Sequence, residues 1–373
     1  MPRYKRAPAT EKLSLQAVVR PNETTIARSA PTRLFRRTGG YFHAMRASTS
    51  PSSFPAAENA AAVLDVMRTN GRIGLVLAAG GLTGIAHHVG NLLALERVTG
   101  WDARSAAVIV GTSAGSITGS LIRRGLNASD LYAFGSGDLE RISSFGRGFL
   151  ESAFNTDRSV SRLPSFRVPT VFELPRLLRL ANQGSASFLM LGFLGSGSYD
   201  VLSLVRSLGD GWPMDPLLVP AVRRSDGKRV VFDGGGGVDL HRAVAASCAV
   251  PGFMQDVDVD GGRFVDGGVS SASNVDLLCT YDLDAVVIVS PMTGDRAGSI
   301  PGAMARRRAQ GKLEGERSLI TDIPVMTLEP RGPLSAQILD EALWSGELSS
   351  IAAGSLDQAT QVIASTERQD VFV

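Results

Sequence analysis

Four short runs of apolar residues recur along the chain, and within them apolar and polar residues do not alternate. Segments rich in glycine and small residues follow the first two runs. Runs of this length are typical of parallel strands that are covered on both faces. Stretches with the apolar spacing of a helix follow the first two runs, over 85–98 and 114–125. The four runs cover residues 73–77, 106–110, 283–290 and 323–330. This alternation predicts an α/β fold, a three-layer sandwich around a central, mostly parallel sheet.

Two further pairs of strand-like segments are separated by tight turns. Segments 216–224 and 228–232 flank Ser225-Asp226-Gly227, and segments 255–259 and 263–265 flank Asp260-Gly261-Gly262. Both turns have the composition of β-hairpins. Further helices are predicted over 59–70, over 240–250 before Pro251-Gly252, and from Ser335 onward. Residues 131–215 are rich in Phe, Leu, Arg and Gly, with a helical pattern over 173–183, and are predicted to form an insertion or lid, or to pack on the sheet.

The composition changes this picture little. The chain has 373 residues, 44% hydrophobic and 20% charged, which is ordinary for a globular protein. It has two cysteines, Cys248 and Cys279, and neither a CxxC nor an HExxH motif. We therefore expect reduced thiols, no metal site and no cofactor. The longest apolar patch, 188–195, is far too short to span a membrane.

The charge is unevenly distributed. Residues 1–46 contain ten Lys or Arg and two Glu, whereas the whole chain has a net charge of +2. This basic head lacks the apolar core of a signal peptide and has no strong periodicity. It is interpreted as a solvated, disordered tail, with Met45 as an alternative start. The other interpretation is contact with an anionic membrane surface.

Two glycine-rich turns carry the candidate chemistry. The first is "AAGGLTG" at 78–84 and the second is "GTSAG" at 111–115, and each lies between a predicted strand and a helix. A dinucleotide site is disfavoured because the order is G-G-x-x-G, and a P-loop is excluded because no Gly-Lys-Ser/Thr follows. A G-x-S-x-G turn between strand and helix is instead typical of a nucleophile elbow. Ser113 would be the nucleophile, and the first turn would donate N–H groups to an oxyanion.

A serine nucleophile needs a base, and the histidines are poorly placed for this role. His43 lies in the basic head, His87 and His88 lie in a helix, and none follows His241. A conventional triad would place its histidine near the chain end, so packing is the favoured role for each of them. A carboxylate could serve instead. Five aspartates precede a glycine: Asp210, Asp226, Asp233, Asp260 and Asp266.

Asp266 differs from the other four aspartates because it ends a short apolar strand and opens a loop of small residues, "DGGVSSASN". Asp226 and Asp260 fit hairpin turns, and Asp233 is the main rival.

Three ordered blocks between 72 and 290 resemble the patatin-like phospholipase family, the bacterial lipid acyl hydrolases in particular. They are "LAAGGLTGIAHHVGNLLALE", "IVGTSAGSITGSLI" and "AVAASCAVPGFMQDVDVDGGRFVDGGVSSASNVDLL". The resemblance implies a Ser113–Asp266 dyad without histidine or metal, and an acyl-enzyme intermediate. It implies an oxyanion hole at Gly80, Gly81 and Leu82. The motif glycines are Gly84, Gly111, Gly115, Gly267 and Gly268.

The first block departs from the family pattern at two positions. Ala79 replaces the first glycine of the usual Gly-Gly-Gly-x-Arg/Lys-Gly loop, and Thr83 replaces its basic residue. A cation would strengthen the field around an anionic head group, so its absence makes neutral esters, thioesters or acylglycerols more plausible substrates. The alternatives are an acyltransferase or thioesterase with the same dyad, and a weakly catalytic lipid-binding protein.

The resemblance also sets the expected organisation. Residues 1–60 form the basic head and linker, 61–290 the catalytic domain, and 291–373 the strand and helices that complete it. The expected partner is a lipid substrate and not nucleic acid, and contact of the basic head with a membrane surface is the second interpretation given above. The expected location is cytoplasmic; the oligomeric state is left open.

Overall fold

The computed structural model describes residues 56–370, except for 137, 139–193, 296–299 and 341–347. The basic head, the predicted helix over 173–183 and most of the predicted insertion lie outside the described residues.

One mixed sheet holds the strands together. Its main path runs β5-β6-β3-β2-β1-β7-β8, and β4 pairs with β3 outside that path. Strands β1, β2, β3, β7 and β8 are parallel, while β4 and β6 run antiparallel to β3. The strands are β1 (Ile73–Leu77), β2 (Val108–Gly111), β3 (Leu217–Arg223), β4 (Arg229–Phe232), β5 (Val257–Val259), β6 (Gly262–Asp266), β7 (Ala285–Val289) and β8 (Val325–Leu328).

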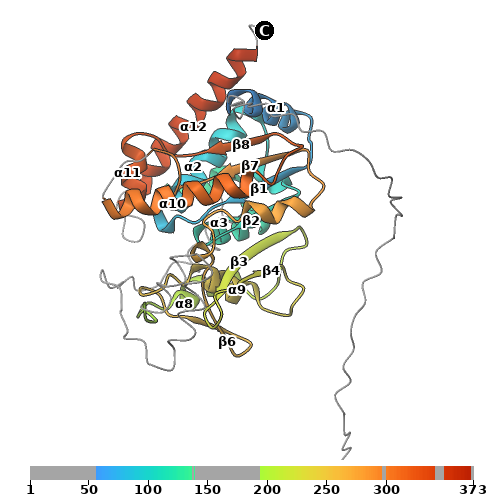
Figure 1. Ribbon diagram of the computed structural model, residues 1–373. Coiled ribbons are helices and arrows are strands. Elements are labelled where there is room, and N and C mark those ends of the chain that lie inside the picture. The colour runs from blue at the N-terminus through green and yellow to red at the C-terminus, as the bar shows by residue number, and fades with distance from the viewer. Residues whose placement is uncertain (1–55, 137, 139–193, 296–299, 341–347, 371–373) are drawn as a thin grey trace, which may run out of the picture. The chain divides into compact units, whose positions relative to one another are not determined.

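Helices cover both faces of this sheet (Figure 1). Leu75 and Leu77 of β1 point into a core shared with α1 (Ala56–Arg68), α2 (Gly81–Thr99), α3 (Ala114–Arg123) and α12 (Leu348–Asp370). Val76 points to the opposite face, where it packs with η5 (Val275–Thr280) and α10 (Ile300–Arg317). Successive strand residues therefore enter two separate cores, which explains the continuous apolar runs. The three-layer α/β sandwich expected from the sequence is confirmed.

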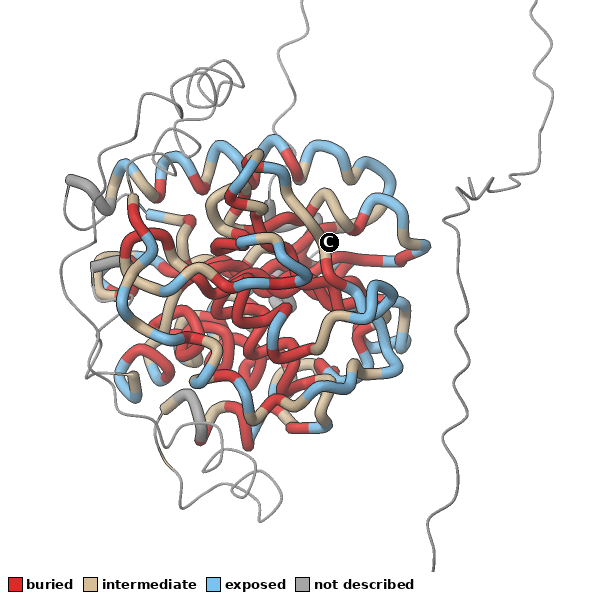
Figure 2. The backbone as a smooth tube through the Cα atoms, turned by 90° about the horizontal axis from the view of Figure 1, so that it is seen from below, coloured by how far each residue is buried: buried red, intermediate tan, exposed pale blue. Residues whose placement is uncertain are grey.

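The described residues form further helices. They are α4 (Ala128–Ser136), α8 (Val201–Val205), η3 (Arg206–Leu208), α9 (Leu240–Cys248) and α11 (Pro333–Asp340), with short turns η1 (Ala103–Ser105) and η4 (Gly267–Val269). Of these, α9 also packs on the sheet. Buried residues concentrate along the strands, whereas exposed residues lie on the outer turns (Figure 2). None of the helices among the described residues has the length and apolar character needed to cross a bilayer.

The two predicted hairpins are present and lie at one side of the sheet. β3 and β4 pair antiparallel with Val219 opposite Phe232, and β5 and β6 pair with Val257 opposite Phe264. Because β6 also pairs with β3, Asp266 lies opposite Ala221. The carboxyl end of β2 pairs with the same strand. The sheet thus brings the end of β6 to the edge where β2 enters its turn.

Candidate active site

Ser113 lies in a sharp turn between β2 and α3. Its φ is 53° and its ψ is −119°, a backbone conformation that residues with a side chain rarely adopt. The turn fits tightly against β1: a Cβ added at Gly115 would lie 1.8 Å from the carbonyl oxygen of Leu77, and one at Gly111 would lie 2.5 Å from that of Gly115. This is the strand–turn–helix geometry of a nucleophile elbow, with Ser113 at its tip.

Asp266 is buried at the end of β6 and is held from two sides. Its N–H donates to the carbonyl oxygen of Ala249 at 2.9 Å, and its Oδ1 accepts the N–H of Gly268 at 2.6 Å. The Ser113 side chain lies close enough to this carboxyl to lower its pKa. The structure therefore brings together the predicted nucleophile and the predicted base, which are 153 positions apart in the sequence.

Burial shapes the acidity of this carboxyl. Loss of hydration raises the pKa of Asp266 to about 6, while the nearby Ser113 side chain and the hydrogen bond from the Gly268 N–H act in the opposite direction. A carboxyl with this pKa is ionised at neutral pH, and it is a stronger base than an exposed aspartate.

The predicted oxyanion loop lies at the start of α2. Gly80 occupies the N-cap, and Gly81 begins the helix with a φ of 63°, a conformation that favours glycine. The first N–H groups of a helix have no acceptor within it, so the N–H groups of Gly81 and Leu82 can serve an anion.

Neighbouring contacts place this loop beside the other two motifs. A Cβ added at Gly84 would lie 3.5 Å from the Cβ of Ala114, and one at Gly268 would lie 3.4 Å from that of Ala79. The oxyanion loop, the serine turn and the Asp266 loop therefore meet at one edge of the sheet.

Thr83, at the position of the family's usual basic residue, is fully buried. Its hydroxyl donates to the carbonyl oxygen of Ile338 in α11 at 2.7 Å and also lies 3.2 Å from that of Gly80. The Thr83 side chain therefore links α2 to α11 by a hydrogen bond.

The groups that support the serine turn were not predicted from the sequence. Ser247 in α9 accepts the N–H of Ser113 at 3.0 Å and donates to the carbonyl oxygen of Pro220 at 2.7 Å. The Ser116 hydroxyl donates to the carbonyl oxygen of Ser113 at 2.7 Å and lies 3.6 Å from the sulfur of Cys248. Burial raises the pKa of that thiol to about 12, so it stays protonated.

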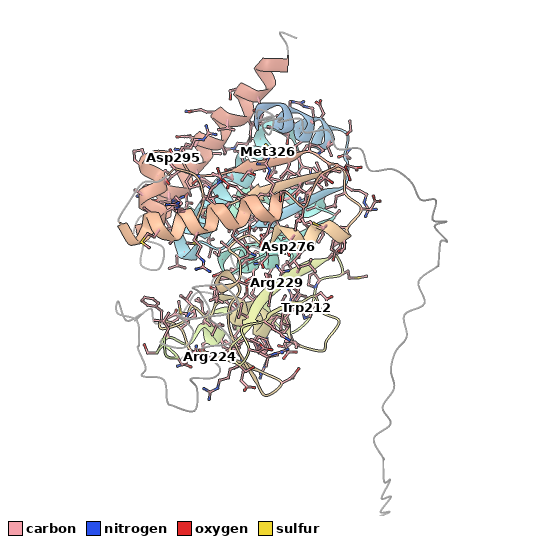
Figure 3. The ribbon with its side chains drawn as sticks, viewed as in Figure 1. Trp212, Arg224, Arg229, Asp276, Asp295 and Met326 are labelled. Atoms are coloured by element: carbon pink, nitrogen blue, oxygen red, sulfur yellow. The ribbon has the colours of Figure 1, made fainter. Side chains whose placement is uncertain are left out.

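A second network supports the residue before the nucleophile. The Asn274 amide donates to the Thr112 hydroxyl at 3.0 Å, and its oxygen accepts from Arg229 at the same distance. Arg229, on β4, also makes two hydrogen bonds of 2.8 and 2.6 Å with Asp276, on η5, and both residues are labelled in Figure 3. No local sequence pattern signals this network, because its members come from three separate segments.

The histidines occupy other places. His87 hydrogen-bonds Ser355 and His88 hydrogen-bonds Thr118, and burial lowers the pKa of each imidazole to about 3. Both are therefore neutral side chains packed inside the protein, and His43 lies outside the described residues. Of the hydrogen bonds that the described histidines make, none reaches Ser113 or Asp266.

The rival carboxylates are also placed elsewhere. Asp233 is exposed and accepts the N–H of Gly235 at 2.9 Å. Asp226 accepts the N–H of Lys228 at 3.2 Å, and Asp260 lies exposed in the β5–β6 turn with a φ of 51°. These three residues have the roles in turns that Asp-Gly pairs usually have.

Comparison with known proteins gives one family. A family model described as patatin-like phospholipase matches residues 75–278, more than half of the chain. A search of the curated proteins finds no match. Among solved structures, VipD from Legionella pneumophila matches with 12% identity and a TM-score of 0.38, over 80% of this chain and 67% of that one. The type III effector protein ExoU matches with 18% identity and a TM-score of 0.36, over 79% of this chain and 53% of that one.

Proposed function

We propose that this chain, which belongs to the patatin-like phospholipase family, cleaves fatty-acyl esters of membrane lipids or acylglycerols with a Ser113–Asp266 dyad. The family is one of lipid acyl hydrolases, and the dyad and the substrate are our proposal. The catalytic domain would comprise residues 61–290, completed by 291–373. The observation that carries the proposal is the proximity of the Ser113 side chain, at the tip of its strained turn, to the buried Asp266 carboxyl.

The dyad supplies the nucleophile and the general acid–base that acyl transfer requires. The Asp266 carboxylate accepts the proton of the Ser113 hydroxyl as Oγ attacks the ester carbonyl. The protonated carboxyl then gives this proton to the leaving alcohol, and an acyl-serine remains. In the second half, Asp266 takes a proton from water, the hydroxide attacks the acyl-serine, and Ser113 regains its proton as the fatty acid leaves.

Two transient negative charges must be stabilised, one in each tetrahedral intermediate. The N–H groups at Gly80, Gly81 and Leu82 are assigned this role because they lie where the positive end of the α2 dipole adds to their effect. They are main-chain groups, so the loop needs no cationic side chain to hold the oxyanion.

The substrate is proposed from the same loop. Thr83 places no charge beside the site, and its side chain is fully buried. A neutral acyl ester, such as an acylglycerol, suits this environment better than a strongly anionic head group. The basic head is proposed to bring the protein to an anionic lipid surface, which would be a separate step from recognition of the ester.

Labelling and turnover test the proposal together. Wild-type protein should react with a fluorophosphonate probe and release fatty acid from a panel of phospholipids, acylglycerols and acyl thioesters. Ser113→Ala should lose both reactions, and Asp266→Asn should lose turnover. Asp233→Asn is the matched control, because it neutralises an exposed aspartate that also precedes a glycine, and it should stay fully active.

Two results would overturn the assignment. Equal labelling of wild type and Ser113→Ala would show that Ser113 is not the nucleophile. Retained turnover by Asp266→Asn, with a normal circular dichroism spectrum, would show that Asp266 is not the base.

A further inference from the structure

A second group of polar side chains lies apart from the dyad, at the start of α9. Asp210, Asp239 and His241 each direct one potential ligand atom into the same space, and these atoms all lie within 4.8 Å of one another. Asp210 follows η3, whereas Asp239 and His241 lie at the first turn of α9. The three residues form no local metal-binding motif in the sequence, because Asp210 comes 29 positions before Asp239.

Main-chain hydrogen bonds hold the two segments side by side. The N–H of Leu240 donates to the carbonyl oxygen of Asp210 at 2.9 Å, and the N–H of His241 donates to that of Gly209 at 3.2 Å. Trp212, labelled in Figure 3, adds a third link, because its indole N–H donates to the carbonyl oxygen of Val238 at 2.6 Å. The main chain therefore holds together the two segments that carry the three side chains.

The imidazole of His241 is the informative member of the group. The residue is only 8% exposed, yet its Nδ1 has no hydrogen-bond partner. Asp210 Oδ1 lies 3.1 Å from that nitrogen, but the pair does not have the geometry of a hydrogen bond. A buried polar nitrogen without a hydrogen-bond partner is costly, and such groups call for a specific explanation.

A shared cation explains both the short distance and the poor angle. Zinc lies about 2.0–2.2 Å from nitrogen and carboxylate ligands. For two ligand atoms 3.1 Å apart, such an ion lies off the line that joins them. The lone pair of Nδ1 would then point roughly 40° away from the carboxylate oxygen, toward the ion. A hydrogen bond would instead require the N–H to point at that oxygen.

Asp239 is available as the third ligand. It occupies the N-cap of α9, but its carboxylate makes no capping hydrogen bond. Its ion pair with Arg242 is long, at 3.7 Å. The two carboxylates act against the unfavourable charges nearby, which include Arg242, the guanidinium of Arg124 on the 208–211 turn and the positive end of the α9 dipole. The Asp210 and Asp239 side chains are 78% and 44% exposed, so water can complete the coordination.

We propose that Asp210, Asp239 and His241 form a binding site for a divalent transition-metal cation of the zinc class. One imidazole nitrogen with two carboxylate oxygens suits Zn²⁺ better than Mg²⁺ or Ca²⁺, which prefer oxygen ligands alone. The ion would tie the turn at 209–210 to α9, whose other end carries Ser247. The ion takes no part in the proposed reaction, so a test that rejects the metal site leaves the proposed dyad unaffected, and the reverse also holds.

Calorimetric titration of the full chain, without a polyhistidine tag and after treatment with a chelator, tests this site. Wild-type protein should bind one Zn²⁺ at this site and should show a higher melting temperature when Zn²⁺ is present. Asp210→Asn and Asp239→Asn should each weaken Zn²⁺ binding at least about tenfold. Mg²⁺ should give no such shift. Asp210→Asn is the decisive variant, because its exposed side chain can change without unfolding the protein.

Two controls separate this site from unspecific binding. Asp260→Asn removes another exposed carboxylate and should bind Zn²⁺ as wild type does. Cys279→Ser removes the exposed thiol and should also leave binding unchanged. Wild-type affinity in Asp210→Asn, or no stoichiometric binding by wild type, would overturn the proposal.

Discussion

The main-chain N–H of Ser113 donates to the hydroxyl oxygen of Ser247, 3.0 Å away. The same hydroxyl donates to the carbonyl oxygen of Pro220 at 2.7 Å. One buried side chain of α9 therefore connects the turn after β2 with β3. Ser113 keeps a positive φ of 53° in that turn, so the hydrogen bond holds an unfavourable backbone conformation in place.

Ser247→Ala should weaken both the fold and the reaction. The change leaves a buried N–H and a buried carbonyl oxygen without a partner, which costs about 1–3 kcal/mol of unfolding free energy. Because Ser113 loses its alignment, kcat should fall about tenfold or more while KM stays nearly constant. Urea unfolding and fatty-acid release measure the two effects.

Ser120→Ala is the matched control for Ser247→Ala. Ser120 is also a buried helical serine, but its hydroxyl donates to the Ser116 carbonyl oxygen within its own helix. It should keep wild-type kcat. An equal loss of kcat in both variants would show that Ser247 has no specific positioning role.

The acidity of Asp266 predicts how activity depends on pH. The dyad works when this carboxyl is ionised, and burial raises its pKa to about 6. We expect kcat/KM to fall about tenfold per pH unit well below this value and to level off above it. A pH profile of fatty-acid release measures this fall in kcat/KM at acidic pH. A flat profile between pH 4.5 and 7 would contradict the role of Asp266 as the base.

The same carboxyl predicts how stability depends on pH. Its pKa is raised in the folded protein from an ordinary value of 3.8 to about 6, so the folded state favours the neutral form. Stability from this group is fully present below pH 3.8 and is lost as the pH rises through about 6. Asp266→Asn should therefore be more stable than wild type above that pH, by roughly 3 kcal/mol.

Denaturant unfolding of wild type and Asp266→Asn at several pH values checks this expectation. The difference between the two proteins should shrink as the pH falls and should disappear near pH 3.8. A constant difference across that range would mean that ionisation of Asp266 does not cause it.

The sequence predicts those parts of the fold and the site that depend on local pattern. The strands of the two-sided core show as continuous apolar runs, and the turn at Ser113 shows as glycines between a strand and a helix. Ser247, Asn274 and Asp210 give no such signal, because their contacts join segments far apart in the chain. Helix α10 was not predicted either, since it is rich in charged residues and only part of one face packs on the sheet, through residues such as Leu313.

Thr83 gives a prediction about the missing basic residue. Thr83→Val keeps the shape but leaves the Ile338 carbonyl oxygen without this donor, so unfolding free energy should fall by about 1–2 kcal/mol with kcat within about twofold. Thr83→Arg should destabilise more, because it places a charge at a fully buried position. Thermal unfolding and turnover of phospholipid and neutral ester measure both variants. A stable arginine variant with higher phospholipid activity would contradict this view of position 83.

Two glycines of α3 test how closely the serine turn packs on β1. A Cβ added at Gly115 would lie 1.8 Å from the carbonyl oxygen of Leu77, a backbone atom that cannot move without displacing the strand. One added at Gly119 would lie 3.0 Å from the Cγ2 of Ile109 and 3.1 Å from the Cδ1 of Leu217, which are ends of side chains. Gly115→Ala should therefore abolish activity and lower the melting temperature strongly.

Gly119→Ala should be close to neutral, because the mild crowding is offset by the better helix propensity of alanine, about 1 kcal/mol. The two variants add the same methyl group to the same helix, one turn apart, so a larger effect at Gly115 reports mainly its contact with β1. Melting temperature and fluorophosphonate labelling measured on both variants decide the matter. If Gly115→Ala kept wild-type labelling, α3 could move away from β1 without disturbing Ser113, and the close packing would not be required for the nucleophile.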